Sequence, residues 1–331
     1  MYERYYGLRE RPFALTPNPR FLYLTGRHRE ALAHLEYGIT GSKGITVVTG
    51  EAGTGKTTLI RAALDSQRAR DIRCVLVDNP TLTRGEFIEL LGREFELSPN
   101  GCQSKAQFLL ELRQLIVERH RTGGITALVI DEAQSLPFEL LEEIRLLANL
   151  ETEDDKLLPV VLVGQPELGV RLNDVSLRQL KQRVALRCAI TSLTLGETSA
   201  YVAGRIRIAG GDAQTLFTRD AVEVVFRYSG GIPRTISVIC DNALINGFAR
   251  SVRPVHRQLV EEVCRDFDLE STAESARSAP TISPDEPAAI EAAGRQAGRS
   301  ENRSAVEHGD LSPADGTIQT FRARRRFSFF R

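Results

Sequence analysis

A glycine-rich loop follows a short apolar run near residue 50, and this pair constrains the fold more than any other feature of the chain. Residues 45–49 read ITVVT, as in a buried strand, and residues 50–58 read GEAGTGKTT. The spacing fits GxxxxGK[ST], in which glycines turn backbone N–H groups toward phosphate oxygens at the start of a helix. The sequence therefore predicts a strand, a phosphate loop and a helix that begins near Lys56.

The loop predicts ATP as ligand and Mg²⁺ as its ion. Lys56 would reach the β- and γ-phosphates, and the Thr57 hydroxyl would hold Mg²⁺. A glycine-rich turn without a ligand is the alternative, but the flanking strand and helix favour the phosphate loop. The residues expected to bind nucleotide are Gly50, Glu51, Ala52, Gly53, Thr54, Gly55, Lys56, Thr57 and Thr58.

A second apolar run, residues 125–130, ends in the adjacent carboxylates Asp131 and Glu132. Successive side chains at a strand end diverge, so the two groups face different positions. Asp131 would hold Mg²⁺ through water, and Glu132 would polarise the attacking water. Such acids are often solvated turn residues, but with a phosphate loop upstream the pair indicates hydrolysis of ATP.

Gln165 follows the apolar run at residues 160–163. Its amide would contact the γ-phosphate or the attacking water. A simple turn at the end of the strand is the alternative.

Arg183 comes just before the apolar run at residues 184–190, after a helical pattern that contains Arg178. We expect Arg183 to reach the nucleotide of a neighbouring subunit as an arginine finger, where it would neutralise charge in the transition state. Arg178 and Arg187 are rivals for this role. An ordinary surface charge is the alternative for all three.

Arg234 stands at the start of a helical pattern, in the segment Gly-Gly-Ile-Pro-Arg at residues 230–234. Pro233 suits the first turn of a helix. We expect Arg234 to project toward the sheet domain, where it would touch the γ-phosphate and report the state of the nucleotide from a mobile lid. A structural ion pair is the alternative.

The alternation of apolar runs and amphipathic patterns predicts an α/β domain followed by an all-α domain. Five runs, at residues 45–49, 74–77, 127–130, 160–163 and 184–190, indicate a parallel five-stranded sheet with helices on both faces. Helical patterns follow at residues 197–209, 218–229, 233–250 and 256–267. We predict an aromatic-rich cap of the nucleotide-binding domain at residues 1–41, with a helix at 28–40. The α/β domain would span 42–194, a helical lid 195–268 and a disordered tail 269–331.

Composition narrows the class of protein. The 331 residues are 42% hydrophobic, and 43 basic residues balance 43 acidic ones, so the whole chain gives no electrostatic argument for binding nucleic acid. No apolar stretch approaches the length of a membrane span, and the N-terminus lacks the pattern of a signal segment. We therefore expect a cytoplasmic protein. Its five cysteines lack metal-ligand spacing and are expected to be reduced, mostly buried thiols.

The last eleven residues mix five arginines with four phenylalanines. Such an end would attract an acidic membrane surface or a partner protein. A solvated tail without a specific ligand is the alternative.

Several motifs together resemble the AAA+ ATPases, which are P-loop NTPases, and within them the general secretion pathway protein A (ExeA-type) and exosortase-associated secretion ATPases. The resemblance covers about residues 1–268. It is carried by Tyr5-Tyr6-Gly7-Leu8, Pro12-Phe13, Pro17-Asn18-Pro19, His28, Ala31-Leu32, Tyr37-Gly38, the phosphate loop, Asp131-Glu132-Ala133-Gln134, Val163-Gly164-Gln165-Pro166-Glu167-Leu168, Leu177-Arg178-Gln179-Leu180 and Gly230-Gly231-Ile232-Pro233-Arg234.

The resemblance implies a bacterial ATPase at the cytoplasmic face of the inner membrane. It would serve secretin or pilus secretion, or exosortase-linked polysaccharide export, with inner-membrane secretion or export proteins as partners. Secretion members of the family continue into a transmembrane helix and a periplasmic peptidoglycan-binding domain. We identify neither here and expect a stand-alone ATPase.

An arginine finger is useful only beside another subunit's site, so we expect a homo-oligomer, as a ring of six subunits. Two alternatives to the secretion role stay open. Related AAA+ proteins are transposition helpers that bind DNA with ATP, a reading that the neutral charge weakens. A nucleotide-gated scaffold with little turnover is compatible with every site residue except Glu132.

Overall fold

The computed structural model describes residues 1–16, 19–21, 23–41, 44–66, 71–78, 80–99, 104–152 and 155–269. The predictions for the C-terminal tail beyond residue 269, including its basic and aromatic end, lie outside the described residues, as does Cys102.

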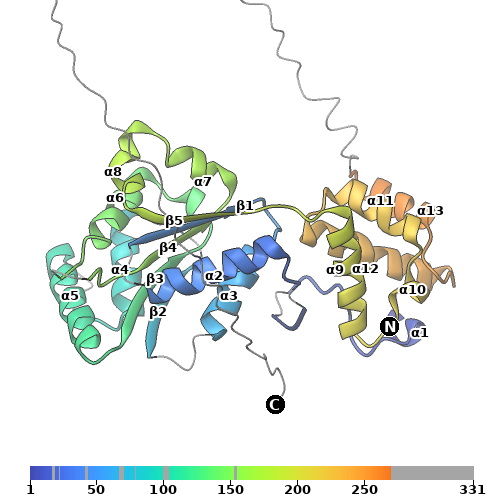
Figure 1. Ribbon diagram of the computed structural model, residues 1–331, viewed down its shortest axis with the longest axis horizontal. Helices are drawn as coiled ribbons and strands as arrows, with labels where there is room; N and C mark the ends of the chain where they lie inside the picture. Colours follow the sequence, from blue (N-terminus) through green and yellow to red (C-terminus); the bar gives the residue numbers. More distant parts are fainter. Residues whose placement is uncertain are drawn as a thin grey trace, which may run out of the picture. The chain divides into compact units, whose positions relative to one another are not determined.

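A parallel five-stranded sheet forms the centre of the α/β domain (Figure 1). Its strands are β1 Ile45–Gly50, β2 Ile72–Val77, β3 Ile125–Ile130, β4 Val160–Gly164 and β5 Val184–Ile190, in the order β2-β3-β4-β1-β5. Every neighbouring pair is parallel. The predicted sheet is therefore confirmed, and the carboxyl ends of its strands share one edge.

Burial explains why these runs could be recognised. Every residue of β1 and of β4 is buried, because helices cover both faces of the central strands. Strand β5 alternates between exposed and covered positions, as expected at the edge of a sheet. Strand β2 begins at Ile72, two residues earlier than predicted, because Ile72 pairs with Ile125 of β3.

Two hydrophobic cores pack against the sheet, one on each face. Helices α2 Gly26–Thr40 and α3 Lys56–Ser66 pack on one face, where Leu35 and Leu59 meet Val48. Helices α4 Arg84–Glu94, α5 Lys105–Arg121 and α6 Phe138–Leu147 contribute to the core on the other face, around Val47. Adjacent residues of β1 thus point to opposite cores, as side chains of a strand do.

Short helices connect the remaining strands of the domain. The 3-10 helix Ala133–Ser135 follows β3, and α7 Pro166–Arg171 follows β4. The 3-10 helix Val175–Leu177 and α8 Arg178–Lys181 then lead into β5.

Five helices form the lid: α9 Leu195–Ile208, α10 Ala213–Leu216, α11 Arg219–Ser229, α12 Pro233–Ala249 and α13 Arg257–Asp266. Four match the predicted patterns. The four-residue α10 was not predicted, because it is too short to show a helical period. Thr194 and Glu197 form a capping box that fixes the start of α9, where the chain leaves the sheet.

The N-terminal aromatic residues belong to the lid core, which differs from the predicted cap of the sheet domain. Helix α1 Tyr2–Tyr6 and the 3-10 helix Pro19–Phe21 lie in this segment, and Tyr2, Tyr6, Phe13 and Phe21 are buried among lid residues. The Tyr6 hydroxyl donates to the carbonyl oxygen of Leu244 at 3.2 Å. From α2 onward the chain does pack on the sheet, so the first 41 residues serve both domains.

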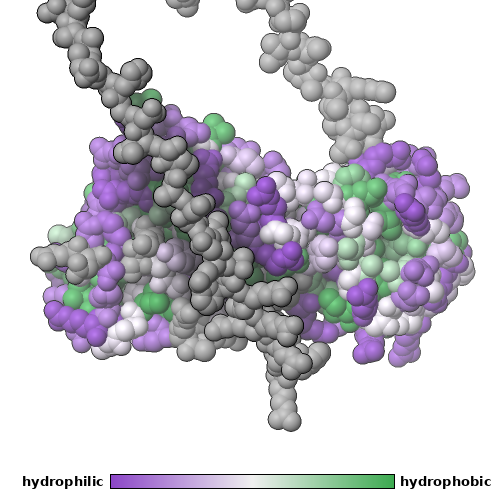
Figure 2. All heavy atoms as spheres, viewed as in Figure 1, coloured by the Kyte–Doolittle hydropathy of each residue, from purple (hydrophilic) through white to green (hydrophobic). Residues whose placement is uncertain are grey.

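Hydrophobic side chains gather on the lid in the face shown in Figure 2, and the visible surface of the sheet domain is mostly hydrophilic. Among the described helices, none has the length and apolar character needed to cross a membrane. Cys74, Cys188, Cys240 and Cys264 are free thiols, and burial raises the pKa of Cys74 and of Cys264 to about 12.

Candidate nucleotide-binding and catalytic site

The phosphate loop joins the end of β1 to the start of α3, as predicted. Helix α3 begins at Lys56, whose side chain is only 5% exposed. Its ammonium donates to the carbonyl oxygens of Gly50 at 2.8 Å and Glu51 at 3.1 Å. Burial lowers the pKa of Lys56, and the carboxylates of Glu132 and Asp131 oppose that shift. A buried cation thus lies inside the loop, close to where phosphate charge is expected.

Two loop glycines have conformations or contacts that other residues would not tolerate. Gly53 and Gly55 have φ angles of +81° and +97°, in the region that favours glycine. A Cβ on Gly53 would also lie 2.8 Å from the Cβ of Arg234. The close approach of the lid to the loop therefore depends on glycine at this position.

The Thr57 hydroxyl donates to a carboxylate oxygen of Asp131 at 2.6 Å. Asp131 is buried at the end of β3, and Thr57 lies in the first turn of α3. The parallel sheet brings the two groups together because β1 and β3 end at the same edge. A hydroxyl beside a carboxylate is an all-oxygen donor set, which suits Mg²⁺ better than softer metals.

Glu132 follows Asp131 in a left-handed backbone conformation, with φ 51° and ψ 34°. This conformation is unfavourable for a glutamate and is typical of functional sites. Its Oε2 accepts hydrogen bonds from the side-chain amides of Gln134, at 2.6 Å, and Gln165, at 3.4 Å. The structure therefore brings Gln165 to Glu132, whereas Gln134 had no predicted role.

Arg234 lies in the first turn of α12 and meets the phosphate loop from the lid side. Its backbone N–H donates to the carbonyl oxygen of Gly53 at 3.1 Å, and its side chain is exposed. Gly231 has a φ of +74°, and a Cβ there would lie 2.0 Å from the carbonyl oxygen of Leu193. The turn before α12 thus needs glycine to pass the end of the sheet domain.

His28 is a site residue to which the sequence gave no role beyond the resemblance. Its ring is buried, with Nε2 3.2 Å from the carbonyl oxygen of Thr54 and Nδ1 2.7 Å from the hydroxyl of Thr25. A carbonyl can only accept, so Nε2 carries the proton. Burial lowers the pKa of His28, which favours this neutral form. No spacing signal marks the residue, because its partner is 26 positions away.

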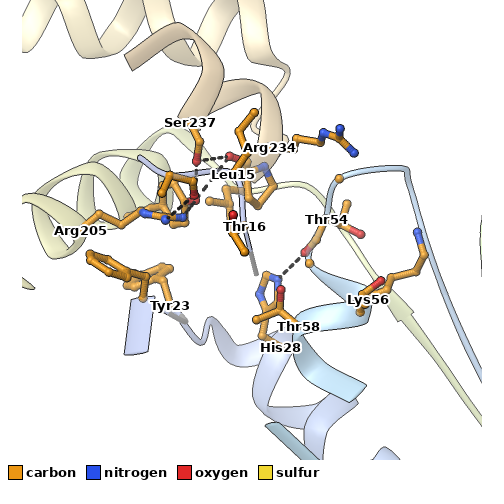
Figure 3. Close-up of a pocket in the computed structure, with 18 of the residues that line it drawn as sticks. Leu15, Thr16, Tyr23, His28, Thr54, Lys56, Thr58, Arg205, Arg234 and Ser237 are labelled. Carbon is orange, nitrogen blue, oxygen red and sulfur yellow. Dashed lines mark hydrogen bonds between the residues drawn. The ribbon is translucent and has the colours of Figure 1, made fainter. Parts of the chain in front are cut away.

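A cavity of about 440 Å³ extends from the phosphate loop between the N-terminal segment and the lid (Figure 3). Its far wall includes Phe21, Tyr23, Tyr201, Arg205 and Ser237. The Tyr201 hydroxyl lies 2.8 Å from that of Ser237 and accepts from the Arg205 guanidinium at 2.5 Å. The volume lies within the usual range for small-molecule sites. Aromatic and polar groups thus face the cavity beside the phosphate loop.

The three candidate finger arginines lie away from this cavity. Arg183 is half-buried, and its carbonyl oxygen accepts from the N–H of Ile45 at 3.1 Å. This contact is at the opposite end of β1 from the phosphate loop, about 17 Å away at 3.3 Å per residue. Arg178 is exposed on α8, and Arg187 pairs with Val47 midway along β5. Within the described chain, none of the three lines the cavity.

Comparison with known proteins gives a consistent picture. A family model described as an AAA domain matches residues 39–172. The general secretion pathway protein A of Aeromonas hydrophila is 43% identical over 251 residues, which cover 76% of this chain and 45% of that protein. The chain thus spans less than half the length of this relative.

Solved structures share the fold at low sequence identity. The match to Drosophila ORC bound to DNA has a TM-score of 0.58 at 19% sequence identity. It covers 82% of this chain and 67% of the ORC chain. The match to the ORC2 protein of Aeropyrum pernix, in ADPNP and ADP complexes, has a TM-score of 0.57 at 15% sequence identity. It covers 82% of this chain and 75% of the ORC2 chain. The match to Cdc6p of Pyrobaculum aerophilum has a TM-score of 0.56 at 17% sequence identity. It covers 79% of this chain and 74% of the Cdc6p chain.

Proposed function

Because this chain belongs to the AAA+ ATPases, and within them to the general secretion pathway protein A family, we propose that it binds ATP with Mg²⁺ and hydrolyses it. The observation that carries the proposal is the juxtaposition of the phosphate loop with the end of β3. Thr57 contacts Asp131 at 2.6 Å, and Glu132 lines the same cavity as Lys56.

Each group would have a separate task. The backbone N–H groups of the loop and the Lys56 ammonium would hold the phosphates. Thr57 and Asp131 would hold Mg²⁺, which when bound supplies positive charge beside the phosphates. Glu132 would orient a water molecule and take its proton. Gln165, which contacts Glu132, would contact that water or the γ-phosphate.

Binding and hydrolysis would be linked to movement of the lid. Arg234 contacts Gly53 through its backbone, and its side chain is exposed at the rim of the cavity, where it would contact the γ-phosphate. Loss of that phosphate would release the lid from the loop. Lids of other enzymes commonly open in this way when product is released. Arg183 would complete the site of a neighbouring subunit in a ring, because it lies far from the loop of its own chain.

We further propose that the cycle drives or regulates assembly of a secretion or polysaccharide-export system at the cytoplasmic face of the inner membrane. The likeness to the Aeromonas secretion protein supports this role. Inner-membrane secretion or export proteins would then be partners, and the tail would reach an acidic membrane surface.

The proposal is tested by phosphate release and by titration of a fluorescent ATP analogue. Wild-type chain should release phosphate slowly, and chelation of Mg²⁺ with EDTA should stop it. Lys56→Ala should lose nucleotide binding by about tenfold or more, because a buried charge partner of the phosphates is gone. Lys181→Ala, at an exposed position on α8, is the matched control. Equal affinities for wild type and Lys56→Ala would contradict the proposal.

A further inference from the structure

Gln134 is held beside Glu132 in one orientation. Its Oε1 accepts from the backbone N–H of Gln165 at 2.9 Å, so its Nε2 must face the carboxylate of Glu132, to which it donates at 2.6 Å. Flipping the amide would set oxygen against oxygen and amino group against N–H. The amide therefore has one orientation that satisfies both neighbours.

The surroundings of Gln134 leave little room for another arrangement. A Cβ on Gly164 would lie 2.7 Å from Oε1 of Gln134 and 3.2 Å from its backbone nitrogen. The backbone oxygen of Gln134 accepts a hydrogen bond from Arg171 of α7. The end of β4, through Gly164 and Gln165, and α7 thus fix the side chain and the backbone of the same residue.

This arrangement distinguishes the two oxygens of the Glu132 carboxylate. Gln134 and Gln165 both donate to Oε2. Among the described residues, no hydrogen-bond donor contacts Oε1. The protein therefore holds one oxygen of the carboxylate, in a residue whose backbone is in an unfavourable conformation.

We propose that Gln134 is a positioning residue for ATP hydrolysis, which orients the Glu132 carboxylate so that Oε1 faces the attacking water. The proposal rests on the function proposed above. Gln134 is not among the described residues that line the cavity, so its effect would be on the geometry of Glu132. Misplacing a catalytic group by about 1 Å can cost about 100-fold in rate.

Gln134→Glu tests the amide donor of Gln134 separately from the size and packing of its side chain. The variant keeps an oxygen to accept from Gln165 and keeps the size of the side chain, but it replaces the amide donor with a carboxyl group whose charge opposes that of Glu132. We expect kcat for ATP to fall between about tenfold and 100-fold, while KM and the Kd of a fluorescent ATP analogue change less than about threefold. Gln134→Leu should behave alike without an added charge. Gln179→Glu, on the exposed side of α8, is the matched control and should match wild type.

Gly164→Ala gives a second, independent measurement. The added methyl group should displace the Gln134 amide and lower kcat by itself. A Gln134→Ala background removes the 2.7 Å contact and leaves only the contacts with Leu168 Cδ2, at 3.1 Å, and with the backbone nitrogen of residue 134, at 3.2 Å. Gly164→Ala should then add a smaller loss, of less than about twofold. If the kcat losses of Gly164→Ala and Gln134→Ala instead multiply in the double variant, the proposal is overturned. Gly164 would then act through something other than the side chain of Gln134.

The failures of the two proposals are distinguishable. Wild-type kcat in both Gln134→Glu and Gln134→Leu, with Glu132→Gln inactive, would overturn the role of Gln134 and leave the ATPase proposal standing. A KM that rises as much as kcat falls would also overturn it, because the defect would then lie in binding. A wild-type chain that does not hydrolyse ATP would overturn both.

Discussion

The His28 ring donates from Nε2 to the carbonyl oxygen of Thr54 at 3.2 Å, and so joins the first turn of α2 to the phosphate loop. The Thr25 hydroxyl holds the other ring nitrogen at 2.7 Å. Thr25 also caps α2 and follows the segment that packs on the lid. His28 therefore lies where the lid-bound N-terminal segment, the sheet domain and the phosphate loop meet.

Replacing His28 should weaken ATP binding by way of the loop. In His28→Ala the buried carbonyl of Thr54 loses its donor, which costs about 1–3 kcal/mol and should raise the Kd for ATP about tenfold. In His28→Gln the amide nitrogen replaces Nε2 and should restore most of the affinity. Titration with a fluorescent ATP analogue measures both, with His256→Ala, at the exposed start of α13, as control. Equal Kd values for His28→Ala and wild type would show that the ring does not support the loop.

The arginine finger is tested by mixing inactive chains. Arg183→Ala should lower kcat by about 10³-fold, as for other fingers, because its charge would stabilise the transition state in the next subunit. Lys56→Ala chains, which bind nucleotide poorly but keep Arg183, should restore activity to the Arg183→Ala chains when mixed. The same experiment with Arg178→Ala and Arg187→Ala decides between the rivals.

Action in trans is excluded if mixed Lys56→Ala and Arg183→Ala chains coassemble without regaining activity while a monomeric wild-type fraction hydrolyses ATP fully. Sedimentation of the same mixtures with and without nucleotide reports whether the chains coassemble and how many subunits the assembly holds.

Duplex DNA distinguishes the secretion role from a transposition role. The chain has zero formal net charge, so we expect weak, salt-sensitive DNA binding that leaves the ATPase rate unchanged. A titration of the ATPase rate with duplex DNA at physiological salt measures this. Stimulation of several-fold, with filaments that form only with ATP, would favour the transposition role instead.

The sequence predicted the sheet and the phosphate loop well because both depend on local pattern. Strand β1 is buried throughout and leads directly into the loop, so its place before the loop follows from the motif. Parallel pairing then puts Asp131 at the same edge as Thr57, although the two residues are 74 positions apart in the sequence.

Contacts that depend on long-range packing were not predictable in this way. Tyr6 and Phe13 are large aromatic residues, so the sequence predicts that they are buried. Nothing in the local sequence indicates that they pack on the lid, more than 200 residues away. The orientation of Gln134 likewise depends on a backbone N–H of the neighbouring strand's end and on the missing side chain of Gly164. Such relationships are visible only once the sheet is assembled.

Glu132→Gln tests the central claim most directly. The variant keeps the size of the side chain and the oxygen that accepts from Gln134, but it removes the carboxylate that would take the proton of water. Phosphate release and binding of a fluorescent ATP analogue should be measured on the same preparation. The account predicts that Glu132→Gln binds ATP with wild-type affinity and releases phosphate at least 100-fold more slowly, since the chemical step is blocked. Hydrolysis at the wild-type rate would contradict the assignment of Glu132 as the catalytic base.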